Sequence, residues 1–465
     1  MVSEELFGSI PPGWKYKTLG AACAEGGGDI QTGPFGSQLH AADYVPVGIP
    51  SIMPQNIGDN RLHEEGIARI TPEDAQRLSR YLVRTGDIVY SRRGDVERRA
   101  LVRTHENGWL CGTGCLRVRL GEKGADPRFV SHYLGHPSVR EWIVRHAHGA
   151  TMPNLNTSIL SACPFLEPPI DEQRAIAHIL GALDDKIELN RRTNETLESM
   201  ARTLFKAWFV DFEPVHAKIE GRWQRGQSLP GLPAHLYDLF PDRLVDSVLG
   251  DIPEGWEIGS FSDAIEIIGG GTPKTAVSEY WNGDIPWFSV VDTPASGDVF
   301  VVQTEKSITP AGLNGSSARL INKGTTIISA RGTVGNLAIT GCDMTFNQSC
   351  YALRGKNGSG NYFVFLSAQR MVEQLRTMAH GSVFSTITRK TFEAVRTVQP
   401  PENICQRFEQ SIAGLFDTIL SNVNESSSLA QLRDTLLPKL ISGELRVPDA
   451  QRIVENQENH NGFSN

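Results

Sequence analysis

Two stretches of the sequence, 232 residues apart, share one helical spacing of mostly apolar residues, with gaps that alternate four and three without interruption. The first stretch comprises Ile176, Leu180, Leu183, Ile187, Asn190, Asn194, Leu197, Ala201, Leu204 and Trp208. The second comprises Phe408, Ile412, Leu415, Ile419, Asn422, Ser426, Leu429, Arg433, Leu436 and Leu440. Such an alternation is typical of a helix that buries one narrow seam against another helix. It therefore predicts two long helices in a duplicated chain.

The two helices are expected to pack on each other as an antiparallel pair, at about residues 171–210 and 402–443. Pseudo-twofold symmetry between the halves places Asn190 opposite Ser426 and Asn194 opposite Asn422 at mid-run. A buried polar layer selects one register, because a slipped pairing leaves the amides against apolar groups. The alternative is two unrelated amphipathic helices, each of which covers its own domain.

The duplication extends beyond the helices. Four further pairs of segments recur in the same order: Pro12-Gly13-Trp14 with Glu254-Gly255-Trp256, Gly86–Gly94 with Gly324–Gly332, His148–Met152 with His380–Phe384, and Pro168-Pro169 with Pro400-Pro401. Short β-branched runs, as at 87–90, 300–303 and 326–329, indicate strands, and helical patterns at 127–136 and 362–380 lie between them. The predicted class is α+β, with two similar mixed α/β domains separated by two long antiparallel helices.

The repeats also divide the chain. The predicted parts are a first mixed domain at 1–169, a first long helix at 170–212, a connector at 213–252 with a helical patch at 239–249, a second mixed domain at 253–400, a second long helix at 401–445 and a disordered tail at 446–465.

Composition narrows the class of protein. No run of eighteen or more apolar residues occurs, and the N-terminal residues include no basic segment, so neither a transmembrane helix nor a secretory signal is expected. Seven scattered cysteines without a C-x-x-C pair indicate reduced thiols in the cytoplasm and no zinc site. The net charge is −8, but residues 1–169 hold 18 basic and 18 acidic side chains and residues 253–400 hold 12 of each. The mixed domains can therefore still present a basic face to a polyanion.

Several segments carry a family resemblance: Leu183–Asn190, Asn194–Leu197, Leu204–Phe212, Leu239-Phe240-Pro241, Ile252–Trp256, Gly269–Lys274 and Ile285–Phe288. With them the chain resembles, over essentially its full length, the specificity subunits of type I restriction–modification systems. The resemblance implies two target recognition domains, each reading one half of a split double-stranded DNA site, and a helix pair that acts as a ruler between them. It also implies two methyltransferase subunits and motor-nuclease subunits as partners in host defence. Those partners would carry S-adenosylmethionine, ATP and Mg²⁺ and would perform N6-adenine methylation or cleavage of unmodified DNA. One departure is Arg433, where the first helix has Ala201, so the seam is not uniformly apolar.

No catalytic motif is found in the residues themselves. The Pro-Pro pairs are followed by Ile170 and Glu402, so neither forms the Asp/Asn-Pro-Pro-aromatic turn of adenine methyltransferases. Neither a G-x-G-x-x-G loop nor a G-x-x-x-x-G-K-[ST] loop occurs. His148 and His380 recur before glycines, where a turn or capping role is favoured over catalysis. We therefore expect a non-catalytic subunit without a cofactor or metal of its own.

The best candidates for DNA contact lie in matched turns and loops, where arginine can fork onto guanine or phosphate and glycine permits close backbone approach. The turns supply Ser91, Arg92, Arg93, Arg98 and Arg99 in the first half and Ser329, Arg331 and Thr333 in the second. Two polar loops add Gln31, Thr32, Phe35, Ser37, Thr272 and Lys274. The alternative for any single residue is a solvated surface position.

Four aromatic residues within eight positions, Phe205, Trp208, Phe209 and Phe212, exceed what one seam can bury and are the candidate partner-binding patch. Packing onto the connector is the alternative. A heptad core of 33 residues (176–208) is roughly 50 Å long at about 1.5 Å per residue, so the half-sites should be separated by a spacer. Other functions remain open: an unknown nuclease or methyltransferase, or a stand-alone DNA-binding or coiled-coil scaffold protein without a methyltransferase partner.

Overall fold

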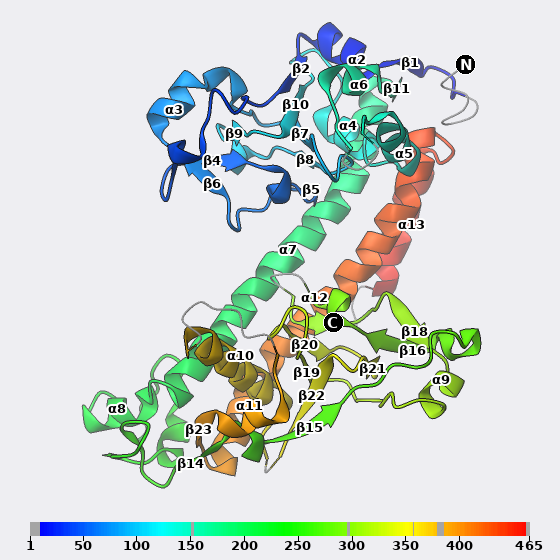
Figure 1. Ribbon diagram of the computed structural model, residues 1–465. Helices are drawn as coiled ribbons and strands as arrows, with labels where there is room; N and C mark the ends of the chain where they lie inside the picture. The colour runs from blue at the N-terminus through cyan, green and yellow to red at the C-terminus, as the bar shows by residue number, and fades with distance from the viewer. Residues whose placement is uncertain (1–9, 150–152, 295–297, 357, 379–385, 462–465) are drawn as a thin grey trace. The chain divides into compact units, whose positions relative to one another are not determined.

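A computed structural model describes residues 10–149, 153–294, 298–356, 358–378 and 386–461 (Figure 1). The chain divides into two compact units. Unit 1 consists of Met1–Asp185 with Leu429–Asn465, and unit 2 consists of Lys186–Ser428. Each long helix contributes residues to both units. Unit 1 is built from two distant parts of the chain, whereas unit 2 is one continuous stretch.

Unit 1 is centred on a five-stranded sheet with the order β2-β10-β7-β8-β5. Its strands are β2 (Asp29–Thr32), β5 (Asp59–Asn60), β7 (Ile88–Ser91), β8 (Arg99–Leu101) and β10 (Cys115–Arg119). A four-stranded sheet, β3-β6-β4-β9, is formed by β3 (Tyr44–Val45), β4 (Ile49–Ile52), β6 (Ala68–Ile70) and β9 (Leu110–Cys111). All four residues of β7 are buried, as expected for a central strand covered on both faces.

Short helices and one further strand pair complete unit 1. They are α2 (Leu19–Gly26), α3 (Pro72–Arg77), α4 (Pro127–Tyr133), α5 (Pro137–His146), α6 (Thr157–Ala162) and the pair β1 (Lys15–Thr18) and β11 (Pro164–Glu167). Helix α4 begins where the sequence places it, because Asp126 accepts hydrogen bonds from two backbone amides of its first turn and Pro127 has no amide to satisfy.

Unit 2 repeats this topology. Its five-stranded sheet has the order β15-β22-β19-β20-β17, and its three-stranded sheet has the order β18-β16-β21. The strands are β14 (Glu257–Ser260), β15 (Ile265–Gly269), β16 (Trp281–Phe288), β17 (Phe300–Val301), β18 (Lys306–Ile308), β19 (Thr326–Ser329), β20 (Leu337–Thr340), β21 (Thr345–Phe346), β22 (Cys350–Gly355) and β23 (Arg396–Gln399). The helices are α9 (Pro310–Asn314), α10 (Asn361–Met378) and α11 (Arg389–Ala394). Ser91 pairs with Cys115 in unit 1 and Ser329 pairs with Cys350 in unit 2, so the predicted duplication is confirmed at the level of strand register.

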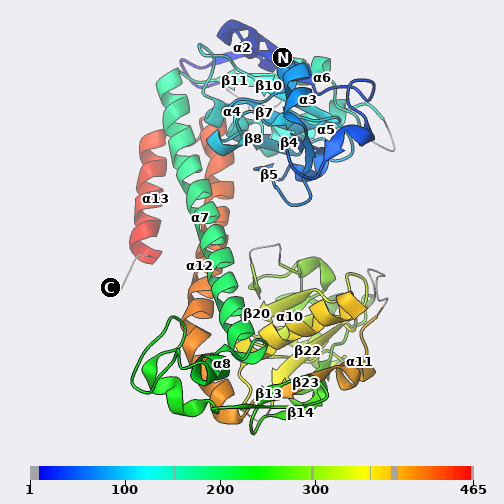
Figure 2. The same ribbon diagram turned by 90° about the vertical axis from the view of Figure 1, so that its left-hand side faces the viewer.

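The long helices are α7 (Ile170–Phe209) and α12 (Glu402–Ser442), which closely match the predicted bounds, and Gly443 follows α12 with the positive φ of a glycine C-cap. Within unit 1, Ile176, Leu180 and Leu183 share a core with Leu436, Leu440 and neighbouring residues of α12. Within unit 2, the two helices lie side by side (Figure 2), and Asn190 Nδ2 donates to Ser426 Oγ at 3.2 Å. Asn422 Nδ2 donates to Asn194 Oδ1 at 2.9 Å, so the antiparallel pair has both polar contacts that the repeat predicts.

The predicted seam residues of the two long helices differ in their burial. Ile176, Leu180, Leu183, Asn190, Asn194, Phe408, Ile412, Ile419 and Leu436 are buried, whereas Ile187, Leu197, Leu204, Leu415, Asn422, Ser426 and Leu429 are half-buried. Half-burial is expected where a two-helix seam is open to solvent at its sides.

Two local predictions are wrong. The 239–249 helical patch is instead β12 (Leu244–Val245), paired with β13 (Ile252–Pro253), and the connector also holds α8 (Glu213–Ile219). The tail forms helix α13 (Val447–Asn461), because Val447, Ala450 and Val454 place an apolar stripe against the core of unit 1. Helix α12 also continues through Pro438, a residue that normally ends or kinks a helix.

Candidate nucleic-acid interface

Three connections meet at one edge of the five-stranded sheet in unit 1. Strand β10 runs antiparallel to both β2 and β7. The loop after β2, the loop before β10 and the turn after β7 therefore lie at the same edge. These connections contain most of the DNA-contact candidates of the first half, so the structure brings them together.

The turn after β7 is held by its own backbone and by one hydroxyl. Ser91 Oγ donates to the Arg93 carbonyl at 3.0 Å, and Gly94 adopts a φ of 74° that a side chain would strain. The Leu155 amide donates to the Arg92 carbonyl at 2.8 Å and fixes the other side of the turn. These contacts leave the side chain of Arg93 exposed at the tip.

Unit 2 contains a turn at the equivalent place, after β19, with a different serine contact. Ser329 Oγ donates to the Thr333 carbonyl, and Gly332 has a φ of 80°. The Ala330 amide donates to the Ser349 carbonyl at 2.8 Å, just as the Arg92 amide donates to the Gly114 carbonyl at 2.8 Å. Arg331 and Thr333 are exposed. Arg93 and Arg331 therefore occupy equivalent places on two equivalent sheets.

Matched glycines bring the neighbouring loops into close approach. A Cβ on Gly33 would lie 2.1 Å from the Gly112 carbonyl oxygen, and a Cβ on Gly270 would lie 2.1 Å from that of Asn347. In unit 2, Thr272 Oγ1 also donates to Gln348 Oε1, which ties the two loops together. Only glycine fits at these crossings, so each loop has a fixed position beside its arginine turn.

The loop candidates differ in exposure. Phe35, Ser37 and Lys274 are exposed, whereas Gln31, Thr32 and Thr272 are half-buried. Exposed arginine, lysine and aromatic groups beside rigid backbone can contact phosphates and base edges. The arrangement therefore has the features of a nucleic-acid reading surface in each unit.

Several predicted contact residues have structural roles instead. Ser91 and Ser329 are buried and shape their turns. Arg99 is only 4% exposed, because it begins strand β8 with its side chain directed inward. Arg98 pairs with Asp95 at 2.6 Å on the surface, and Arg92 is half-buried. Direct DNA contact thus fits Arg93 far better than its neighbours.

Two groups of residues near the corresponding edge of the sheet in unit 2 were not predicted as candidate DNA contacts. Gln348 is exposed in the loop before β22, and its place in an Asn-Gln-Ser turn was the available signal. Arg319 and Arg389 line an open cleft of about 510 Å³ with Gly269, Gly270 and Ser317. Arg389 Nη2 donates to the Ile267 carbonyl at 2.8 Å. Only the folded chain brings these two arginines to the polar glycine loop.

The aromatic patch proposed for partner binding belongs largely to the core of unit 2. Phe205 and Trp208 are 8% and 2% exposed, and Trp208 packs edge-on against Phe240 of the connector with ring centroids 5.2 Å apart. Phe209 and Phe212 pack against Trp256 at 6.0 and 5.6 Å. The prediction of a free docking patch is therefore wrong, because the connector and the second half supply the apolar groups that cover these rings.

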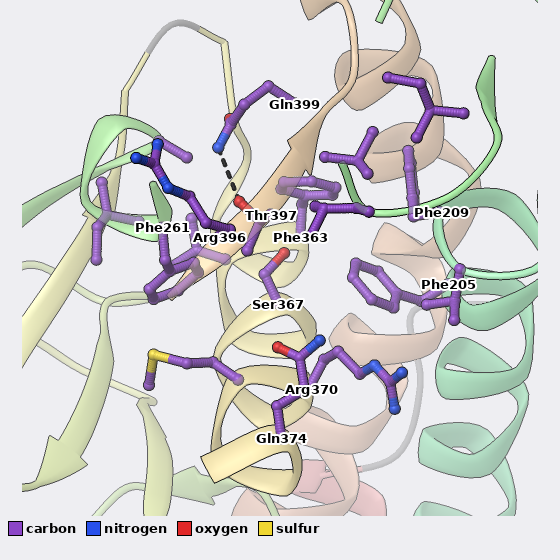
Figure 3. Close-up of a pocket in the computed structure, with 18 of the residues that line it drawn as sticks. Phe205, Phe209, Phe261, Phe363, Ser367, Arg370, Gln374, Arg396, Thr397 and Gln399 are labelled. Atoms are coloured by element: carbon purple, nitrogen blue, oxygen red, sulfur yellow. Dashed lines mark hydrogen bonds between the residues drawn. The ribbon is translucent and has the colours of Figure 1, made fainter. Parts of the chain in front are cut away.

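Part of the patch still lines a cavity of about 300 Å³ in unit 2. Figure 3 shows Phe205 and Phe209 of α7 beside Phe363 and Ser367 of α10, with Arg396, Thr397 and Gln399 of β23 at another wall. Gln399 Nε2 donates to Thr397 Oγ1 at 2.9 Å. Aromatic and aliphatic residues make up most of the cavity lining, polar residues the rest, and the cavity lies outside the candidate DNA surface.

Two similar candidate DNA surfaces on duplicated sheets, together with paired helices, fit a duplicated DNA specificity protein. Residues 40–199 and 253–432 match the family described as type I restriction modification DNA specificity domain. The chain belongs to this family, and it is a non-catalytic specificity subunit of a type I restriction enzyme.

Individual relatives agree in length and fold. The chain is 27% identical over 438 residues to the type I restriction enzyme HindI specificity subunit of Haemophilus influenzae, covering 85% of this chain and 95% of that protein. It is 23% identical over 456 residues to the MjaIX specificity subunit of Methanocaldococcus jannaschii, covering 96% of both. The crystal structure of a type I restriction–modification S subunit from M. genitalium has a TM-score of 0.53 at 16% identity, covering 93% of this chain and 96% of that one, which supports the fold.

In the part of the chain that the structure describes, none of the helices is long and apolar enough to cross a membrane. The same residues contain no cluster of three or more His, Cys, Asp or Glu side chains placed to hold a metal ion. The matched histidine His380 lies outside the described residues, and His148 pairs through its backbone with Asn154.

Proposed function

We propose that the chain binds a bipartite double-stranded DNA target and directs N6-adenine methylation, or cleavage of unmodified DNA, by partner subunits. One recognition domain in each half reads one half-site, and the helix pair sets the spacing. The equivalence of Arg93 and Arg331 carries this proposal, since two equivalent exposed arginines on two equivalent sheets suit two half-sites. Gly33 and Gly270 support it, because they hold a second loop beside each arginine.

Replacing Arg93 by alanine is expected to weaken recognition of one half-site, and replacing Arg331 by alanine that of the other. Loss of an arginine at a base edge costs about 1–3 kcal/mol, or roughly tenfold to a hundredfold in affinity. The target can be identified by mapping N6-methyladenine in the DNA of cells that express the complete enzyme. Competition binding with DNA altered in either half-site then measures discrimination by each variant.

Arg145→Ala is the matched control, because Arg145 is exposed on α5 of the same unit and pairs with Glu141. It should leave both half-sites unaffected. If Arg93→Ala and Arg331→Ala bind every DNA as the unaltered complex does, the two turns do not read the target.

Partner docking is proposed for an outward stripe of α7 in unit 2. Leu189 and Met200 are exposed large apolar residues, and Thr193 and Thr196 lie between them at helical spacing. The two threonine hydroxyls donate to carbonyls of their own helix at 2.8 and 3.0 Å, so they present methyl groups outward. The stripe suits a helix of a methyltransferase subunit, which would carry S-adenosylmethionine, while ATP and Mg²⁺ belong to motor-nuclease subunits.

Co-purification from the native host tests this docking and separates the proposal from a stand-alone DNA-binding or scaffold protein. A methyltransferase should co-purify with the unaltered chain and be lost on Leu189→Glu with Met200→Glu, because charges in a buried helix interface are uncompensated. Exposed Arg192→Glu, beside the stripe, is the comparison variant. Equal recovery with the double variant would place the docking surface elsewhere.

A further inference from the structure

A group of four charged residues and one buried histidine in unit 1 joins the first recognition domain to both long helices. Arg433 of α12 donates from Nη1 to Asp184 Oδ1 of α7 at 2.8 Å. Its Nη2 also lies 4.0 Å from Asp59 Oδ2 of β5. Asp59, Arg99, His132, Asp184 and Arg433 are called the ionic cluster below. Arg433 of one long helix thus contacts both the other long helix and the sheet of the domain.

The domain side of the ionic cluster is closely coordinated. Arg99 donates from Nε to the Ser131 carbonyl of α4 at 2.7 Å and from Nη1 to Asp59 Oδ1 at 3.2 Å. Buried His132, also on α4, lies with Nδ1 3.9 Å from Asp184 Oδ2. The contacts connect α12, α7, β5, β8 and α4 without interruption.

At the positions equivalent to Arg433 and Asp184, unit 2 has apolar groups, although an exposed ion pair between Arg202 of α7 and Glu373 of α10 (2.8 Å) also connects the helix to the domain. The helical repeat makes Ala201 the equivalent of Arg433 and Phe416 the equivalent of Asp184. Strand register makes Leu337 the equivalent of Arg99, because Tyr90 pairs with Arg99 and Ile328 pairs with Leu337. Ala201 and Phe416 are fully buried, and Phe416 stacks on Tyr362 of α10 with ring centroids 4.2 Å apart. A carboxylate remains near this joint at Asp298, which accepts a hydrogen bond from Asn194 at 3.3 Å.

The two joints have different physical properties. An apolar joint is non-directional and tolerates small shifts, whereas charge-assisted hydrogen bonds have a preferred geometry. The Asp184–Arg433 pair is largely buried, with side chains 13% and 21% exposed, whereas the Asp59 side chain is 65% exposed. A largely buried ion pair adds little net stability, but removal of one partner leaves a charge uncompensated. The ionic cluster is therefore better suited to fixing an orientation than to adding stability.

We propose that Arg433 is a positioning residue that fixes the first recognition domain on the helix pair, at a position where the second half has buried Ala201. Its effect on DNA reading rests on the proposed function, whereas its effect on the domain itself does not. Loss of Arg433 should loosen the first recognition domain alone. The second domain has buried Ala201 at the equivalent position and should be unchanged.

Amide hydrogen exchange on the full chain without DNA tests this proposal. Arg433→Met keeps the aliphatic stem and should accelerate exchange in β5, β8 and α4 roughly tenfold or more, with no change in α10 of unit 2. Arg433→Lys keeps the charge and should restore most of the protection. Asp59→Asn alters the domain side alone and should give a smaller acceleration in the same strands. Arg452→Met, on exposed α13, is the matched control.

Two outcomes would overturn the proposal. Unchanged exchange in β5, β8 and α4 of Arg433→Met would show that the arginine holds nothing in place. An equal acceleration in both units would show that it acts on general stability. Footprinting of the methylated target with the complete complex is a separate measurement, in which Arg433→Met should lose protection of the Arg93 half-site only. A wild-type complex without any footprint would refute the proposed function and leave the exchange result standing.

Discussion

Replacing Phe408 by alanine is expected to lower the free energy of unfolding of unit 2 by about 3–5 kcal/mol, the usual cost of deleting a buried phenyl ring. The Phe408 side chain is fully buried on α12. Its ring lies 4.9 Å from that of Phe209, 5.4 Å from that of Trp208 and 5.9 Å from that of Phe205. The cavity left by alanine would therefore remove the ring contacts between the two helices at their most aromatic layer.

Urea unfolding followed by tryptophan fluorescence measures this loss, because Trp208 lies against Phe408. Phe35→Ala removes the same ring from an exposed loop of unit 1 and should change stability by less than about 0.5 kcal/mol. A similar small change for Phe408→Ala would mean that the aromatic layer does not hold the helix pair together.

Acidification from pH 7 to pH 5 is expected to destabilise unit 1 by about 2 kcal/mol for each of two histidines. Burial lowers the pKa of His132 to about 4, against the opposing effect of Asp184. Burial also lowers the pKa of His136 to about 4. Both are neutral in the folded unit, and the unfolded chain binds protons more readily. The contribution of the two neutral histidines to the stability of unit 1 is therefore fully present above pH 6.5 and is lost as the pH falls toward 4.

The hydrogen bonding of His136 also predicts that acidification destabilises unit 1. Its Nδ1 accepts the Ser138 amide at the start of α5 at 3.1 Å, and a proton on that nitrogen would end the capping contact. Urea unfolding of unit 1 at the two pH values checks the prediction. His136→Asn keeps a capping acceptor without a titrating group and should remove about half of the pH effect, while exposed His178→Gln should leave it intact. Equal stability of wild-type unit 1 at pH 5 and pH 7 would contradict the assignment.

The helix pair could be predicted from the sequence because its determinants are local and repeated. The four-three spacing fixes which face of each helix is buried, and Asn190 and Asn194 fix the register opposite Ser426 and Asn422. The paired turns were also recognisable, since Gly94 and Gly332 mark the same strained backbone in both halves. Because the patterns occur twice, the two halves of the sequence could be aligned with each other.

The errors arose where distant residues decide the environment. Arg99 looks like a surface cation, but Asp59 and the Ser131 carbonyl give it a buried site. The aromatic run of α7 looks like a docking patch until the connector residue Phe240 and Trp256 of the second half are placed on it. Spacing along one segment does not contain such information, because the covering groups come from elsewhere in the chain.

The stretches of chain that form each unit determine the order in which the units can fold during synthesis. Unit 2 is continuous from Lys186 to Ser428, whereas the core of unit 1 includes Leu436, Leu440 and Ala450. The first recognition domain leaves the ribosome first, yet its core is completed only after residues 429–450 have emerged. Until then its apolar surface is open to chaperones and proteases. A nascent chain of which only the residues up to Ser428 had emerged would thus have a complete unit 2 and an incomplete unit 1.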